Sequence, residues 1–213
     1  AYADTPQVAV DIAPVHSLVA RVMDGVGTPD LIIQPGASPH EYSLRPSEAA
    51  ALQNANLVFW IGPDLTPWLI DTIKTLAPDA AVTALMEADG TIELEFREGA
   101  LFEAHAHEDD DDHADEAHDD HEEEGHDDHS DDDHDDEEAG HDEHDHGDHD
   151  PHAWLSPQNA MTWMNVIAGQ LSAADPDNAG AYFANAAAGR AEIKDLIGEV
   201  TATLDPVRDG RFI

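Results

Sequence analysis

An acidic, histidine-rich tract is the feature that most limits how this chain can fold. Between residues 104 and 149, twelve histidines are mixed with Asp, Glu and Gly, and the apolar spacing of helices and strands is absent. Such a segment cannot bury enough apolar surface to offset the entropy of ordering its backbone, and its like charges repel. We therefore predict that residues 104–149 form a disordered loop and that the sequence on either side supplies the folded structure.

The same tract carries most of the net charge of −40. Of the 48 acidic residues, 26 lie between residues 108 and 150, whereas the rest of the chain has 22 acids and 8 bases. A chain without a basic patch cannot release the counterions that drive phosphate binding, so cations are its natural partners. No apolar stretch approaches the roughly 20 residues that span a bilayer. We expect neither nucleic-acid binding nor direct membrane insertion, and we expect a monomer.

Residues 1–103 alternate short apolar runs with helical patterns, which is typical of an α/β lobe with a mostly parallel sheet flanked by helices. Ser47 is the predicted N-cap of the second helix, with Glu48 in its first turn. The predicted strands are 8–12, 31–33, 57–61 and 81–84, and the predicted helices are 15–23, 47–54 and 66–76.

Helical patterns resume after the tract. Residues 150–173 hold a helix that Ser156 caps and Pro157 begins, and the predicted buried face is Met161, Met164, Ala168 and Leu171. A long, gently amphipathic helix is predicted over 174–206, with a face formed by Tyr182, Ala186, Gly189, Ile193, Ile197, Val200 and Leu204. A new strand is expected to begin within 207–213, so we expect the sequence to be a fragment.

Two histidines outside the tract stand in stiff surroundings. His40 follows Pro39 in a glycine-containing loop, and His152 follows a proline directly before a helix. Proline restricts the backbone beside each imidazole, and Asp150 is placed to accept a hydrogen bond from the ring of His152. Either Pro-His pair alone is more often an ordinary surface feature. His16, in a helical pattern, is predicted to be structural or to line a cleft.

The histidines of the tract point to metal ions without selecting one. Imidazole suits zinc, copper and nickel, whereas carboxylates suit calcium and magnesium. The alternative is a solvated acidic spacer, although a spacer does not require histidine. The candidate auxiliary ligands are His105, His107, His113, His118, His121, His126, His129, His134, His141, His144, His146 and His149.

Four runs of the sequence form a pattern together: GASPHEYSLRPS at 36–47, LQNANLV at 52–58, Gly-Pro at 62–63 and DPHAWLSP at 150–157. These runs resemble the zinc-binding ZnuA-type subgroup of cluster A-I substrate-binding proteins. The resemblance implies a periplasmic metal-binding-protein fold, in which a long helix joins two α/β lobes and zinc lies between them. Residues 1–103 and 150–173 would form the N-terminal lobe, 174–206 the interlobe helix and 207–213 the start of a second lobe that is largely missing.

The resemblance also implies a function. Such a protein captures Zn²⁺ in the periplasm, after export and removal of its signal peptide, and delivers it to an ABC importer permease in the inner membrane. A periplasmic zinc chaperone is a second candidate partner, and the tract would be an auxiliary zinc-acquiring segment. His40 and His152 would each donate a nitrogen to zinc, and a third histidine would come from the second lobe. Glu41 is a further candidate ligand, because some relatives carry an acid directly before the first histidine, where this chain has Pro39.

Other functions remain open at this point. The chain is alternatively a manganese-binding member of the same transport family, or a periplasmic metal buffer in which the tract is the whole function. A zinc hydrolase is least favoured, because the sequence has no His-Glu-x-x-His helix, nucleophile elbow or phosphate loop. We therefore expect no enzymatic activity.

Overall fold

The computed structural model describes residues 5–96, 149–208 and 210, and the described residues contain a four-stranded parallel sheet of order β2-β1-β3-β4. The prediction of an α/β fold with a parallel sheet is confirmed. β4 has the predicted bounds, and the other three strands end one or two residues earlier than predicted. The strands are β1 (Val8–Val10), β2 (Asp30–Leu31), β3 (Leu57–Trp60) and β4 (Ala81–Ala84).

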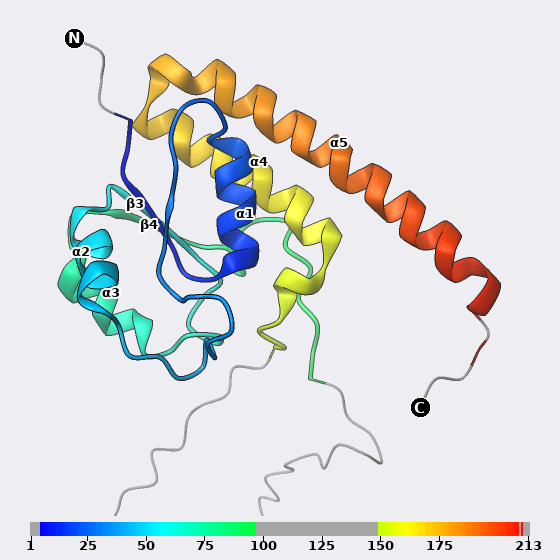
Figure 1. Ribbon diagram of the computed structural model, residues 1–213, viewed down its shortest axis with the longest axis horizontal. Coiled ribbons are helices and arrows are strands. Elements are labelled where there is room, and N and C mark those ends of the chain that lie inside the picture. Colours follow the sequence, from blue (N-terminus) through cyan, green and yellow to red (C-terminus); the bar gives the residue numbers. More distant parts are fainter. Residues whose placement is uncertain (1–4, 97–148, 209, 211–213) are drawn as a thin grey trace, which may run out of the picture. The chain divides into compact units, whose positions relative to one another are not determined.

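Helices cover both faces of this sheet (Figure 1). One face carries α2 (Pro46–Asn54) and α3 (Leu69–Leu76), and the other carries α1 (Ala13–Val22), α4 (Pro157–Ala174) and α5 (Ala179–Leu204). Helices α4 and α5 pack along each other, and both contact α1. Every residue of β1 and β3 is buried, as expected for parallel strands that are covered on both sides.

The predicted start of α4 is confirmed, whereas the predicted N-cap of α2 is wrong. The Ser156 hydroxyl accepts a hydrogen bond of 3.3 Å from the amide of Asn159, and Pro157 is the first helical residue. In α2 the N-cap is Arg45 rather than Ser47, and Glu48 lies in the first turn as predicted. Proline at position 46 needs no amide partner and has a helical φ already set, so the helix begins one residue earlier.

Helix α3 begins at Leu69, three residues later than predicted. Pro67 disfavours a helical conformation for Thr66 directly before it. The chain instead forms a turn in which the Leu69 amide donates to the Thr66 carbonyl at 2.9 Å. This turn places Trp68 at the N-cap of α3, where it contacts the loop that carries Pro39 and His40.

The buried face of α4 is wider than predicted. Met164 and Leu171 are buried as expected, but Met161 is only partly buried, and Trp163 is fully buried instead. The Trp163 indole N–H donates to the Thr91 hydroxyl at 2.9 Å, so its polar group is satisfied in the core. A long-range partner of this kind cannot be read from helical spacing.

Helix α5 is a single helix of 26 residues, and only its first half has the predicted apolar face covered. Tyr182 and Ala186 are fully buried, whereas Val200 and Leu204 are about half exposed. Two small turns of 3-10 helix flank it at Pro176–Asn178 and Asp205–Val207.

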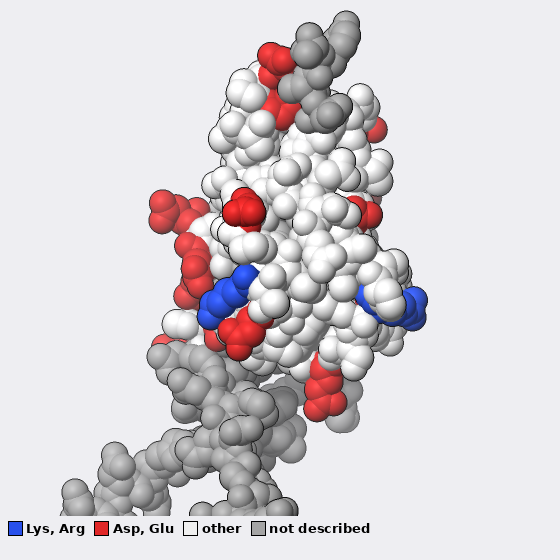
Figure 2. Space-filling view, turned by 90° about the vertical axis from the view of Figure 1, so that its left-hand side faces the viewer, with Lys and Arg blue, Asp and Glu red and all other residues white. Residues whose placement is uncertain are grey.

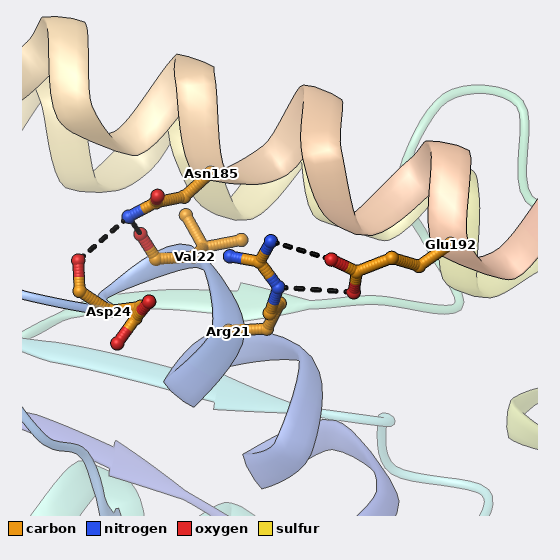
Figure 3. A network of polar contacts seen from close by, with 5 residues as sticks. All are labelled: Arg21, Val22, Asp24, Asn185 and Glu192. Carbon is orange, nitrogen blue, oxygen red and sulfur yellow. Dashed lines mark hydrogen bonds and ion pairs between the residues drawn. The ribbon is translucent and has the colours of Figure 1, made fainter.

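Polar contacts fasten the covered half of α5 to the end of α1 (Figure 3). The Arg21 guanidinium makes an ion pair with Glu192 at 2.8 Å, and the Asn185 amide donates to the carbonyls of Val22 at 3.0 Å and Asp24 at 2.8 Å. Glu192 is exposed and Arg21 is partly exposed, so water screens the ion pair and it contributes little to stability. Asn185 fixes the position of α5 by satisfying two backbone carbonyls near the end of α1.

The face drawn in Figure 2 shows carboxylates scattered between uncharged groups, with few basic side chains. This agrees with the excess of acids over bases, 22 to 8, in the sequence outside residues 108–150. Within the described part of the chain, no helix combines the length and apolar character needed to cross a bilayer.

Candidate metal centre

The loop that carries His40 follows β2 and leaves the sheet at the carboxyl ends of its strands, the edge where open parallel sheets bind ligands. Gly36 has a φ of +86°, a conformation that glycine adopts without strain. The Trp68 indole N–H donates to the carbonyl of Pro39 at 2.8 Å. This bond fixes the backbone directly before the imidazole of His40.

A second set of contacts holds the loop on the other side of His40. The Tyr42 ring centre lies 6.0 Å from that of Trp68, and its hydroxyl donates to Glu48 at 2.9 Å. Burial and this hydrogen bond raise the pKa of Tyr42 above its ordinary value. The other Glu48 oxygen accepts from the Arg45 amide at 2.8 Å, so one buried carboxylate connects the loop to the start of α2.

His152 lies in the turn before α4, and Asp150 orients its ring as predicted. The Asp150 Oδ1 atom is 2.7 Å from the His152 Nδ1 atom and accepts a second bond from the His152 amide at 3.0 Å. A carboxylate can only accept, so Nδ1 carries a proton, and in the neutral imidazole Nε2 is then the nitrogen with the free lone pair. The imidazole therefore presents one nitrogen that is ready to bind a metal.

The rings of His40 and His152 lie side by side, with centres 5.7 Å apart and planes at 64°. Two imidazoles that share a tetrahedral zinc at about 2.0–2.1 Å from each nitrogen have ring centres about 5 Å apart. The difference is less than about 1 Å, which small side-chain rotations cover. The two predicted ligands, far apart in sequence, thus meet at a distance that suits a shared ion.

The other predicted ligands are placed differently. Glu41 is exposed in the His40 loop, and no group of three or more His, Asp or Glu side chains within residues 5–96, 149–208 and 210 is arranged to hold a metal. His149 lies beside Glu93, with its Nδ1 atom 3.7 Å from the carboxylate. The other eleven histidines of the tract lie outside the described residues, as do residues 209 and 211–213 of the segment in which a new strand is expected.

His16 is structural, which was one of its two predicted roles. Its Nε2 atom lies 3.0 Å from the carbonyl of Pro29 and links α1 to the segment before β2. This contact uses one ring nitrogen, and His16 has no second histidine beside it among the described ring contacts. His16 is therefore a control residue for experiments on His40 and His152.

A buried carboxyl group at the same sheet edge was not anticipated from the sequence. Asp11 directly follows β1 and is 1% exposed, and its oxygens accept hydrogen bonds of 2.7 Å from the amides of Ile12 and Ile61. Burial raises the pKa of Asp11 to about 7, although these amide bonds act in the opposite direction. Asp11 therefore joins the carboxyl ends of β1 and β3.

A family model described as "ZnuA: Zinc-uptake complex component A periplasmic" matches residues 8–213. The chain belongs to this family. The proteins similar to it include two that are described as high-affinity zinc uptake system protein ZnuA. The relative from Brucella abortus (strain 2308) is 50% identical over 206 residues, which cover 97% of this chain and 60% of the relative. The relative from Paracoccus denitrificans (strain Pd 1222) is 46% identical over 213 residues, which cover 100% of this chain and 61% of the relative.

Solved structures of ZnuA share the fold. A crystal structure of a 138–173 deletion mutant of ZnuA with zinc bound has a TM-score of 0.67 and 23% identity, covering 95% of this chain and 60% of that one. A manganese-bound periplasmic metal-binding protein from Candidatus Liberibacter asiaticus has a TM-score of 0.57 and 18% identity, covering 95% and 56%. The predicted fold of the ZnuA family is confirmed, and this fold is found with either metal.

The chain spans about 60% of the length of the relatives it matches. The family description names a component of zinc uptake, which agrees with the prediction that the chain is not an enzyme. Sequence reasoning missed the bonds from Trp68 to the Pro39 carbonyl and from Asn159 to the Ile92 carbonyl. Both acceptors are main-chain atoms of distant segments, 29 and 67 residues away, and local patterns do not reveal them.

Proposed function

We propose that the protein captures zinc in the periplasm and passes it to an ABC permease for import, with His40 and His152 as two of its ligands. The observation that carries this proposal is the 5.7 Å approach of the two rings, with the Nδ1 atom of His152 held by Asp150. The description of the family as a periplasmic component of a zinc-uptake complex supports the periplasmic location. A permease is proposed as the partner because uptake requires the ion to cross a membrane.

The donor set favours zinc over manganese. Imidazole nitrogen suits zinc, whereas manganese prefers carboxylate, carbonyl and water oxygens. The carboxylate of Asp150 binds the ring of His152 rather than facing an ion with both oxygens, so it supports a nitrogen ligand. The fold is also found with manganese, so the fold alone does not select the metal. The selection is made by these ligands and by those still to be identified.

Two imidazoles do not complete a tetrahedral site, so further ligands must join them. Glu41 is one candidate in the same loop, and the others come from residues outside the described ones. In this arrangement residues 1–103 and 150–173 form one lobe, residues 174–206 form a connecting helix, and 207–213 lead into a second lobe. The tract at 104–149 collects ions near the site, because tethering raises their local concentration.

The proposal is tested by residue-resolved zinc protection. The chain is held at a series of chelator-buffered free zinc concentrations and labelled with diethyl pyrocarbonate, and modification of each histidine is measured by mass spectrometry. Buffering keeps ions bound by the tract from changing the free concentration. We expect His40 and His152 to become protected over the same zinc range, and His40→Ala to remove the protection of His152.

A matched control is His16→Gln, which we expect to leave the protection of the pair unchanged. Protection of His152 that persists unaltered in His40→Ala would refute a shared ion. The same series with buffered manganese distinguishes zinc transport from manganese transport. For zinc transport, zinc should protect the two histidines at a lower free concentration than manganese does. Deleting residues 104–148 tests the metal-buffer alternative, because a buffer loses its tightest binding, whereas a capture protein keeps coupled protection of the pair.

A further inference from the structure

One fully buried side chain, Asn159 in the first turn of α4, connects the two segments that frame the tract. Its Nδ2 group donates to the carbonyl of Ile92 at 2.9 Å and to the carbonyl of Ala153 at 3.0 Å. Its Oδ1 atom accepts from the amide of Ile92 at 2.7 Å. Both N–H groups and the oxygen of the Asn159 amide are thus bonded to main-chain atoms of two separate segments.

These two segments matter for the metal site. Ala153 directly follows His152, and it begins the short 3-10 turn Ala153–Leu155 that leads into α4. Ile92 belongs to the stretch that enters the tract, where the Leu94 carbonyl accepts from the Asp150 amide at 2.7 Å. The backbone on both sides of His152 is therefore attached to this stretch, through Asp150 before it and through Asn159 after it.

We propose that Asn159 is a positioning residue for His152, because one buried amide fixes the ligand-bearing turn to the stretch around Ile92 that leads toward the tract. This inference rests on the proposed role of His152 as a metal ligand. Asn159 acts through the backbone and does not touch the ion. It determines where the Nε2 atom of His152 points relative to His40, while Asp150 determines which nitrogen is protonated.

The chemistry of the bonds explains why an amide is required. The Ile92 main chain offers one donor and one acceptor, and Ala153 offers a second acceptor. A side-chain amide supplies an oxygen acceptor and two N–H donors, which matches this set. A carboxylate of the same shape keeps the bond from the Ile92 amide but turns an oxygen toward two carbonyl oxygens, and repulsion should displace the turn.

Asn159→Asp is therefore the informative variant, measured in the whole chain by the zinc-protection assay above. Asn185→Asp is its matched control, because Asn185 also donates to two backbone carbonyls, at the junction of α1 and α5 (Figure 3). We expect Asn159→Asp to move the protection midpoint of the histidine pair to about tenfold higher free zinc, the low end for lost support of a ligand. Asn185→Asp should lower the melting temperature and leave the midpoint within about twofold.

A double-mutant cycle separates positioning from general destabilisation. In the His152→Ala background, Asn159→Asp should cause no further change in zinc protection of His40. A further change there, or equal midpoint shifts in Asn159→Asp and Asn185→Asp, would overturn the positioning role while leaving the shared site intact. If His152→Ala itself does not alter protection of His40, the shared site is refuted and this inference falls with it. If Asn159→Asp fails to fold, Asn159→Ala replaces it in the same assay, because it removes the same donors without adding charge.

Discussion

Replacing Asp150 with asparagine tests how far a carboxylate charge contributes to metal binding by His152. Asparagine can still accept hydrogen bonds from the His152 ring and amide, so the substitution changes the charge more than the geometry. Loss of a partner that orients a metal-binding histidine typically costs about 10–100-fold in affinity. The side chains of Asp150 and His152 are 39% and 42% exposed, so water screens the charge.

We therefore expect the low end of that range, about tenfold, which corresponds to about 1.4 kcal/mol of binding free energy. Asp150→Ala removes the acceptor as well and should cost about tenfold more. The assay is the free zinc concentration at half-protection of His152 from diethyl pyrocarbonate, with His16→Gln as the control that should not shift it. An unchanged midpoint in both Asp150 variants would show that the 2.7 Å contact does not support metal binding.

Three further predictions concern the rest of the molecule. The amount of zinc bound by the tract should decrease markedly as the pH falls from 7.5 to about 5.5, because free imidazole titrates at about pH 6.5. The bound zinc is measured by equilibrium dialysis, and equal stoichiometry at both pH values would exclude imidazole as the main ligand of the tract. The pKa of Asp11 is raised from 3.8 to about 7, so its folded state holds a proton that the unfolded state releases. The contribution of Asp11 to the free energy of unfolding should therefore fall by up to about 4 kcal/mol as the pH rises from about 4 to 8. It is measured by urea unfolding as the difference between the wild type and Asp11→Ala, and a difference that does not change with pH would contradict this. Trp68→Phe keeps an aromatic ring beside Tyr42 but loses the hydrogen bond to Pro39. This should lower the free energy of unfolding by about 1 kcal/mol and raise the free zinc concentration at which His40 is half-protected. If neither value changes, this bond does not hold the loop.

The ends of helices show how far local sequence signals reach. Ser156 and Pro157 gave the start of α4 correctly, because capping depends on atoms within three residues. Ser47 was the wrong N-cap for α2, although the same rule applied, because Pro46 was available one residue earlier. The start of α3 was misplaced because Pro67 restricts the residue before it, a local effect that the apolar spacing concealed.

The amino-acid sequence by itself determined the parallel α/β class, the long final helix, the acidic tract and the two Pro-His motifs, because periodicity, turn residues and charge act over short stretches. Only the tertiary structure decided that His40 and His152 meet, that Asn159 joins Ile92 to Ala153, and that Asp11 is buried between strand ends. It also decided that half of the apolar face of α5 stays exposed. These features depend on contacts between segments far apart in the chain, and a local pattern specifies which residues can be buried but not which partners they meet.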